Sequence, residues 1–262
     1  MQLRISLGQI DVIFGEPAIN RQKVEGLAAE AARRGSQVLV LPELWSTGYD
    51  LARADRYATP TDAGLFAHVR ALARQHQLII IGSCLSQLGP GQYGNTLTVA
   101  MPDGSSGGEY SKLHLFRLME EERYLTAGTR LGLVDLPWGR CGLAICYDLR
   151  FPELFRAYAL AGAQLIFLPA EWPQPRLNHW QTLLRARAIE NQLFVVACNR
   201  VGQAGDTRFF GHSCVIDAWG ETVIEGGESE MMLTADIDLQ EVAAARARIP
   251  VFADRRPEVY GG

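Results

Sequence analysis

The feature that most constrains this chain is a repeated alternation of strand-length apolar runs with helix-length segments. Runs that are apolar on both faces occupy 37–43, 78–84, 141–146, 163–169 and 193–199. A strand that is apolar on both faces needs helices over both sides of its sheet. The alternation therefore predicts an α/β protein whose sheets are covered by helices.

Helical periodicity and turn residues divide the rest of the chain. We predict helices over 19–34, 62–77 and 176–190, and another that begins at Pro152, a residue favoured in a first helical turn. Residues 94–116 form two extended segments around a Gly/Ser turn, which predicts a hairpin. Residues 212–225 and 231–238 predict two further hairpin-like pairs. These hairpins argue against an all-parallel barrel.

The length and composition suit one large domain. The chain has 262 residues and is 48% hydrophobic, which is enough for a full core. No linker, low-complexity tract or fixed-period repeat divides it. We predict a single domain over 1–262, with a C-terminal tail that is extended from about residue 248.

Charge and cysteine usage narrow the partners and the compartment. The net charge is −4 and basic residues are scattered among acidic ones, so we expect no nucleic-acid partner. The N-terminal residues lack the pattern of a secretion signal, and no apolar run is long enough to span a bilayer. An odd number of cysteines in apolar surroundings is typical of reduced thiols. We expect a cytoplasmic protein with no membrane contact. The cysteines are Cys84, Cys141, Cys146, Cys198 and Cys214.

The strongest local signal is the segment CGLAICYDLRFPEL. An apolar strand ends at Cys146 and a helix begins near Pro152. A nucleophile at a sharp strand-to-helix turn projects from the sheet, where backbone N–H groups such as that of Tyr147 can face an oxyanion. The alternative is that Cys146 is another core thiol. The polar neighbours Tyr147, Asp148 and Arg150 favour a functional site.

Two further segments carry candidate functional groups. In VLVLPELWSTGYD, Glu43 follows a buried strand, at the sheet edge where α/β ligand sites collect. Partial burial there would raise the pKa of the carboxyl toward the range useful for a general base. In GEYSKLHLF, Lys112 closes a hairpin strand. Its ammonium could stabilise a thiolate and an oxyanion. The alternatives are a solvated carboxylate and a surface lysine.

The order PELxxxGY, KLHLF, CYDLRFPE resembles the nitrilase superfamily of carbon–nitrogen hydrolases, over nearly the whole chain. This resemblance implies a four-layer αββα sandwich of the nitrilase type. It also implies that Cys146 is the nucleophile, Glu43 its base and Lys112 the oxyanion-stabilising cation. A second glutamate of that family corresponds to Glu121, although Glu120 and Glu122 are adjacent. The resemblance implies no metal or organic cofactor. It does imply a homodimer or a larger homo-oligomer.

The segment PAEWPQPRLNHWQTLLRARAIENQ is informative about the substrate. It resembles bacterial omega-amidases, which implies hydrolysis of the side-chain amide of 2-oxoglutaramate or 2-oxosuccinamate. Such substrates carry a carboxylate, and Arg176 is our candidate to bind it because a guanidinium grips a carboxylate bidentately. Some of those relatives have Asn where this chain has Glu171, and an extra carboxylate would oppose an anion unless it is paired. We also expect Phe116, Tyr147, Glu171 and Trp172 to line the substrate site.

Several alternatives remain open at this stage. The substrate could be another amide, such as a deaminated glutathione or an N-carbamoyl amine, or a nitrile, and the chain could instead be a non-catalytic scaffold subunit. His114 could be the partner of Cys146 in a papain-like pair. The GxGxxG match at 89–94 precedes a strand and not a helix, so we expect no nucleotide site. The cysteine spacing does not favour zinc.

Overall fold

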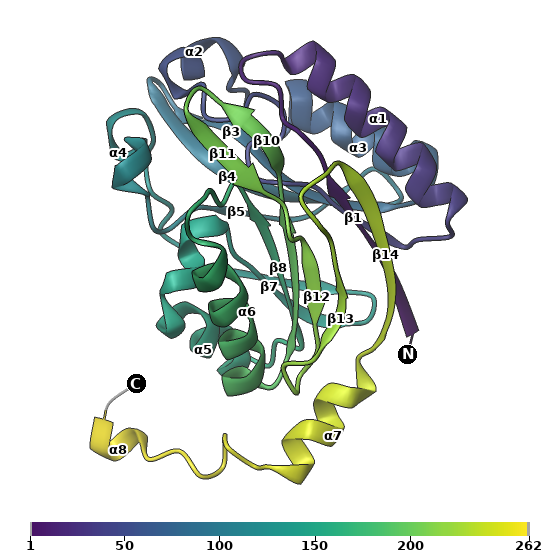
Figure 1. The fold of residues 1–262 in the computed structure, drawn as a ribbon, viewed down its shortest axis with the longest axis vertical. Helices are drawn as coiled ribbons and strands as arrows, with labels where there is room; N and C mark the ends of the chain where they lie inside the picture. Colours follow the sequence, from purple (N-terminus) through teal and green to yellow (C-terminus); the bar gives the residue numbers. More distant parts are fainter. Residues whose placement is uncertain (1, 261–262) are drawn as a thin grey trace.

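The computed structural model describes residues 2–260, and it contains two six-stranded sheets stacked face to face. In Figure 1, α1 (Pro17–Arg33) and α3 (Gly64–His76) cover one sheet, while α5 (Pro152–Leu160) and α6 (Leu177–Asn191) cover the other. The order of layers is helix, sheet, sheet, helix. The predicted αββα sandwich is therefore confirmed.

The first sheet has the strand order β14-β1-β2-β3-β4-β5. Its strands are β1 (Gln2–Gln9), β2 (Val38–Val40), β3 (Ile79–Gly89), β4 (Gln92–Ala100), β5 (Ser106–Ser111) and β14 (Met231–Asp238). β1, β2 and β3 are parallel, and the predicted hairpin at 94–116 is the antiparallel pair β4 and β5. β14 pairs with β1, so our prediction of a terminal hairpin is wrong for 231–238. The pairing joins the first strand of the chain to the last one among the described residues.

The second sheet has the order β13-β12-β9-β8-β7-β6. Its strands are β6 (Gly132–Leu136), β7 (Gly139–Leu143), β8 (Leu165–Ala170), β9 (Phe194–Asn199), β12 (Cys214–Ile216) and β13 (Thr222–Glu225). β7, β8 and β9 are parallel and lie at its centre. The remaining pair, β10 (Val201–Ala204) and β11 (Thr207–Phe210), forms a small separate sheet that we did not predict.

The helices α1, α3 and α6 begin and end within two residues of the predicted bounds, and α5 begins at Pro152 as predicted. A fifth, α7 (Gln240–Arg248), follows β14. The short helical segments are η1 (Leu51–Arg53), α2 (Ala54–Tyr57), η2 (Arg117–Met119), α4 (Glu121–Tyr124), η3 (Cys146–Arg150) and α8 (Pro257–Tyr260). Among residues 2–260, none of the helices is long and apolar enough to cross a membrane.

The alternation of side chains along each strand divides the core between two spaces. In β2, Val38 and Val40 belong to the large cluster that includes the space between the sheets and continues under α5 and α6, whereas Leu39 belongs to the cluster under α1 and α3. Successive strand residues face opposite sides of a sheet, so a strand covered on both faces has to be apolar throughout. This requirement explains the uninterrupted apolar runs of the sequence.

The C-terminal tail leaves the sandwich after α7 and passes below α5 in Figure 1. Phe252 lies between two guanidinium groups, 5.2 Å from that of Arg156 and 5.1 Å from that of Arg246. The chain turns at 251–254 and ends in the short helix α8. The prediction of an extended tail is therefore wrong for these segments.

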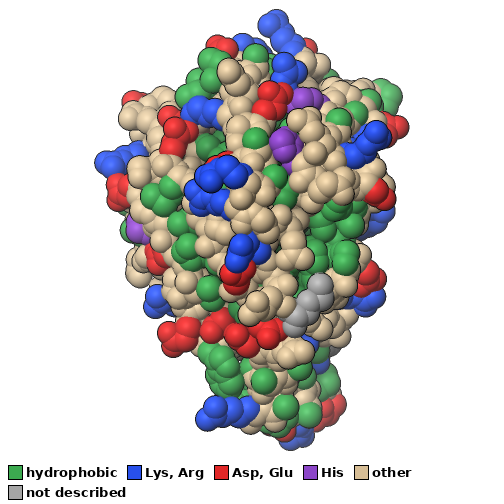
Figure 2. Space-filling model, turned by 90° about the vertical axis from the view of Figure 1, so that its right-hand side faces the viewer, with side chains coloured by type: hydrophobic (Ala, Val, Ile, Leu, Met, Phe, Trp, Pro, Cys, Tyr) green, Lys and Arg blue, Asp and Glu red, His purple; other side chains and the backbone are tan. Residues whose placement is uncertain are grey.

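The charged side chains are mixed on the face that Figure 2 shows. Basic and acidic groups alternate over most of it, and a row of acidic side chains crosses it above the narrow lower lobe, where α7 lies. The net charge of −4 agrees with this mixed surface. No basic stripe that could follow a nucleic-acid backbone is visible on this face.

Candidate active site

The candidate catalytic residues follow strands of both sheets and meet between them. Glu43 follows β2 and Lys112 follows β5 in the first sheet, while Cys146 opens η3 after β7 in the second. Glu121 begins α4, nine residues after Lys112. The side chains of Glu43, Lys112 and Glu121 are fully buried, and Cys146 is 5% exposed. Buried charges at this density need mutual pairing.

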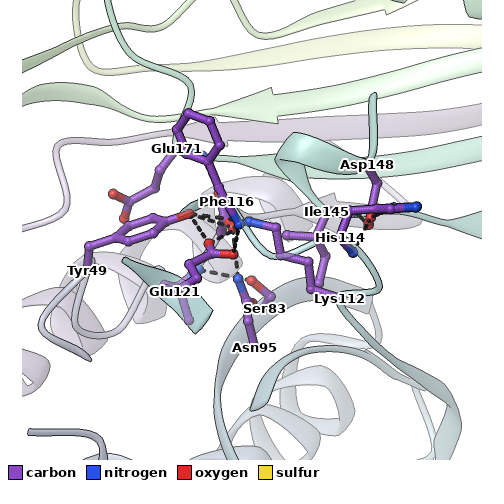
Figure 3. Close-up of polar contacts among 12 residues, drawn as sticks. Tyr49, Ser83, Asn95, Lys112, His114, Phe116, Glu121, Ile145, Asp148 and Glu171 are labelled. Carbon is purple, nitrogen blue, oxygen red and sulfur yellow. Dashed lines mark hydrogen bonds and ion pairs between the residues drawn. The ribbon is translucent and has the colours of Figure 1, made fainter. Parts of the chain in front are cut away.

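Lys112 is bound between two carboxylates (Figure 3). Its Nζ lies 2.8 Å from Glu43 Oε1 and 2.6 Å from Glu121 Oε1. The Tyr49 hydroxyl lies 3.0 Å from the same oxygen of Glu43 and 2.6 Å from that of Glu121. Because the hydroxyl has one proton, it can donate to only one of these carboxylates at a time.

Other donors complete the hydrogen bonding of the Glu43 and Glu121 carboxylates. The Asn95 amide donates to Glu43 Oε1 at 2.8 Å, and the backbone N–H of Glu171 donates to Glu43 Oε2 at 2.9 Å. The backbone N–H of Phe116 donates to Glu121 Oε2 at 2.8 Å. Glu43 thus has four donors within hydrogen-bond distance and Glu121 has three, with the single Tyr49 hydroxyl shared between them. This network fixes both carboxylates around a single ammonium.

The cluster controls the charge of each member. Burial alone would lower the pKa of Lys112, but Glu121 and Glu43 outweigh it, so the pKa rises and the ammonium stays protonated. Burial raises the pKa of Glu121, and Lys112 partly opposes this increase. Burial, together with the negative charge of Glu43, also raises the pKa of the Cys146 thiol. A protonated thiol in this place needs a base before it can attack.

Cys146 occupies a strained turn. Its φ is +44°, in the left-handed region that a residue with a side chain rarely adopts. The Asp148 carboxylate holds the turn by accepting the backbone N–H of Ile145 at 2.9 Å and the hydroxyl of Tyr110 at 2.8 Å. Strain of this kind costs about 1–3 kcal/mol and persists where the surroundings enforce it. The turn presents the thiol toward Glu43.

A second strained turn positions Glu43. Leu44, the next residue, has a φ of +42°, and its N–H donates to the Ser83 hydroxyl at 2.9 Å. Ser83 lies on β3, which is the neighbour of β2 in the sheet. The side chain of one strand thereby fixes the end of the next, so that Glu43 points into the space between the sheets.

His114 is engaged elsewhere. Its Nδ1 lies 2.7 Å from Asp148 Oδ1, and its backbone N–H donates to the same oxygen at 3.2 Å. Its ring stacks on that of Phe151, with 3.6 Å between ring centroids. Figure 3 shows the imidazole directed toward Asp148. These contacts do not support the papain-like alternative.

Four of the residues predicted to contact the substrate lie close to one another: Phe116, Tyr147, Trp172 and Arg176. Phe116 contacts Tyr147 with 4.7 Å between ring centroids, and the Arg176 guanidinium lies 5.9 Å from the Phe116 ring. Trp172 is buried and its indole donates to the Arg176 carbonyl at 3.1 Å. Phe116 also lines two surface cavities of about 350 and 310 Å³, one bounded by Arg176 and the other by Tyr147.

Glu171, the carboxylate that the sequence left in doubt, is paired. It follows β8, and its Oε2 accepts from Arg200 at 3.2 Å. Sequence reasoning missed Arg200, Tyr49 and Asn95. Tyr49 stands within the quoted PELxxxGY motif, and an arginine directly after the apolar run 193–199 is unusual enough to have been noticed. Asn95 gave no such signal, because its contact with Glu43 depends on β4 pairing with β3, which in turn pairs with β2.

Among the described residues, no group of three or more His, Cys, Asp or Glu side chains is arranged to hold a metal ion. The polar groups of the site are instead bound to one another. The family model for carbon–nitrogen hydrolases matches residues 4–247. The chain belongs to this family.

Relatives of this carbon–nitrogen hydrolase cover its whole length. It is 44% identical to the 2-oxoglutaramate amidase of Bacillus subtilis (strain 168), over 99% of this chain and 100% of the relative. A CN-hydrolase superfamily structure from Xanthomonas campestris, with an arsenic adduct in its active site, is 35% identical with a TM-score of 0.91, covering 98% of both chains.

A third relative bears on the chemistry of the thiol. The structure of an amidase mutant from Nesterenkonia is 27% identical with a TM-score of 0.87, covering 98% of this chain and 95% of that chain. In that protein the acetamide moiety of fluoroacetamide is covalently bound to the active-site cysteine.

Proposed function

We propose that this enzyme hydrolyses the side-chain amide of a small 2-oxo acid, 2-oxoglutaramate or 2-oxosuccinamate, to a carboxylate and ammonia. The observation that carries the proposal is the buried ammonium of Lys112 between Glu43 and Glu121, beside the Cys146 thiol. The 44% identity with a 2-oxoglutaramate amidase supports the choice of substrate.

The first half of the reaction forms a thioester. Cys146 Sγ attacks the amide carbon while Glu43 takes the thiol proton. The negative charge that develops on the amide oxygen is held by Lys112 and the backbone N–H of Tyr147. The C–N bond then breaks, and protonated Glu43 gives its proton to the departing nitrogen, which leaves as ammonia.

The second half uses the same carboxylate in the opposite order. Glu43 takes a proton from a water molecule, whose oxygen attacks the thioester carbon. The C–S bond breaks and the proton returns from Glu43 to the sulfur. The product is the dicarboxylic 2-oxo acid, and Cys146 is restored. Apart from the substrate and this water molecule, each step uses only side chains and backbone groups of this chain.

We assign Glu121 and Tyr49 to positioning. Glu121 shares Lys112 with Glu43 and is itself held by the Phe116 N–H, so it fixes the ammonium without being placed to take the thiol proton. Glu120 and Glu122 are the neighbouring candidates from the sequence. Both are exposed, whereas Glu121 is buried, which favours Glu121 as the second glutamate.

We assign binding of the substrate carboxylate to Arg176. Its guanidinium lies at a cavity that Phe116 also lines, next to the buried Trp172. A planar guanidinium can hold a carboxylate through two parallel hydrogen bonds. Phe116, Tyr147 and Trp172 would enclose the short carbon chain between the carboxylate and the amide.

The test measures ammonia release from 2-oxoglutaramate and 2-oxosuccinamate, with glutamine and asparagine as matched amides that lack the oxo group. We expect release from the oxo acids with the wild type and with Cys84→Ala, a control at another buried thiol, and none with Cys146→Ala. Wild-type protein that is inactive on both oxo acids would contradict the proposal. Deaminated glutathione, N-carbamoyl amines and nitriles would then separate the other hydrolase alternatives from a scaffold.

We also propose that the chain is a single cytoplasmic domain that forms a homodimer or a larger homo-oligomer. Exposed apolar side chains on the outer helices and the tail support the assembly, among them Leu160, Ile189 and Val259. Such side chains are typical of interface positions when they gather on one face. Light scattering of the purified protein measures the mass, and a monomer at micromolar concentration would contradict this proposal.

A further inference from the structure

The three buried carboxylates of the site differ in how well they are solvated by the protein. Glu43 has four donors within hydrogen-bond distance and Glu121 has three, with the Tyr49 hydroxyl shared between the two. Glu171 accepts from one, the Arg200 guanidinium. An ionised carboxylate needs several donors to replace its water, so the environment of Glu171 suits a charged group far less well.

One oxygen of Glu171 has no partner. Its Oε1 is buried without a hydrogen bond. This oxygen faces Gly48, and a Cβ atom added to that glycine would lie 3.6 Å from it. The residue is only 1% exposed. Figure 3 shows the carboxyl extending toward the ring of Tyr49, which offers no donor on its face. A negative charge on this oxygen would have no hydrogen-bond donor from the described residues.

The single cation that contacts Glu171 is shared. Arg200 is fully buried, and its Nη2 lies 2.8 Å from Asp11 Oδ1 and 2.7 Å from the Val12 carbonyl. Its Nε donates to the Val201 carbonyl at 3.0 Å, and its plane lies 4.2 Å from the Phe209 ring. Asp11 therefore already neutralises much of this guanidinium.

The balance of charge around the site also disfavours an ionised Glu171. Acidic groups outnumber basic ones: Glu43, Glu121, Glu171 and Asp11 face Lys112 and Arg200. Burial, together with the charge of Glu43, raises the pKa of Glu171 to about 8, although Arg200 and Lys112 oppose the increase. Protonating Glu171 removes the least stabilised negative charge of the group.

We propose that Glu171 is held as an uncharged carboxylic acid with its proton on Oε1, and that this neutrality determines whether the site accepts an anion. Glu171 is then a specificity-determining residue. The inference rests on the proposed function in one respect, which is that the natural substrate carries a carboxylate. The Glu171 carboxyl interacts electrostatically with both Glu43 and Lys112, so a charge on it acts on the space where the substrate reacts.

The proposal predicts that the preference of the site for neutral over anionic reagents increases with pH. Below about pH 8 the acid is neutral, and an anion meets no repulsion from it. As the pH rises past that value Glu171 ionises, and anionic reagents are disfavoured relative to neutral ones of the same shape. The other titratable groups that face it are those named above, and they affect wild type and variant alike.

The test compares alkylation of Cys146 by iodoacetate, an anion, and iodoacetamide, its neutral analogue, from about pH 6.5 to pH 9.5. The ratio of the two rates cancels ionisation of the thiol. For the wild type we expect this ratio to fall about fivefold or more across the range, the size of a Coulomb repulsion at partial screening. For Glu171→Gln, which has a similar shape and no charge, we expect a constant ratio.

The controls separate the possible failures. Glu221→Gln changes an exposed glutamate and should follow the wild type, and Cys146→Ala should show no labelling at this site. A wild-type ratio that stays constant would overturn the inference without any variant, and so would an equal fall in wild type and Glu171→Gln. Neither readout requires turnover, so failure of the oxo-acid assay and failure of this inference are distinguishable.

Discussion

At the residue scale, the site is organised around one ammonium that serves two carboxylates. Lys112 keeps its proton because Glu43 and Glu121 together outweigh the effect of burial. Removing either carboxylate leaves the buried ammonium with one charged partner in place of two. Breaking a buried ion pair from one side typically costs about 3–5 kcal/mol, because the remaining charge is left uncompensated. Here the second carboxylate limits that loss.

We predict that Glu121→Gln lowers the kcat for amide hydrolysis about 100-fold while KM changes little. The amide side chain cannot hold the Lys112 ammonium as the carboxylate does, so the oxyanion loses a fixed cation. We also expect the free energy of unfolding to fall by about 2 kcal/mol. Steady-state kinetics and urea unfolding measure these effects. Glu122→Gln, an exposed neighbour, should leave both unchanged, and similar losses in the two variants would contradict the assignment of Glu121.

At the scale of elements, sequence reasoning placed most of the pieces and missed some of their partners. The long helices were predictable because their periodicity and their end residues are local properties. The pairing of β14 with β1 was not, since it joins residues more than 200 positions apart, such as Gln2 and Asp238. The sequence of a strand indicates which of its faces is apolar, but it does not indicate which strand pairs with it.

The same distinction applies to the candidate site. Cys146 was visible in the sequence because a strand, a polar cluster and a helix start occur within a few residues. The contacts of Asn95 and Arg200 were not, because they form only when the two sheets and their neighbouring strands are assembled. The charge state of Glu171 likewise depends on a cation that is 29 residues away along the chain.

The turn that carries Cys146 is itself a small element with its own support, the carboxylate of Asp148. We predict that Asp148→Asn lowers kcat at least about tenfold and the free energy of unfolding by about 2 kcal/mol, because buried N–H and O–H donors lose a charged acceptor. Kinetics and chemical unfolding again provide the measurement. The matched control is Asp135→Asn, which removes an exposed ion pair with Arg140 and should change the unfolding free energy by less than about 1 kcal/mol. Equal effects of the two substitutions would refute this role.

At the scale of the whole molecule, Arg200 joins the two sheets. It follows β9 in the second sheet and binds Asp11 and Val12, which follow β1 in the first. The core between the sheets is likewise continuous, with Val40 and Phe167 in one cluster. An arrangement in which each sheet covers the other leaves neither half a complete core of its own. The molecule should therefore unfold as one cooperative unit.

Hydrogen exchange tests that cooperativity. We predict that amides in β2 and β9 exchange with the same free energy of opening, because both strands are exposed only by global unfolding. Arg200→Met should lower this free energy by about 3 kcal/mol in both strands, since Asp11 loses its cation and Glu171 loses its hydrogen-bond donor. Arg208→Met, which removes an exposed pair with Glu228, should lower it by less than about 1 kcal/mol. If Arg200→Met weakened β9 while β2 kept its protection, the two sheets would unfold separately and the prediction of one domain would be wrong.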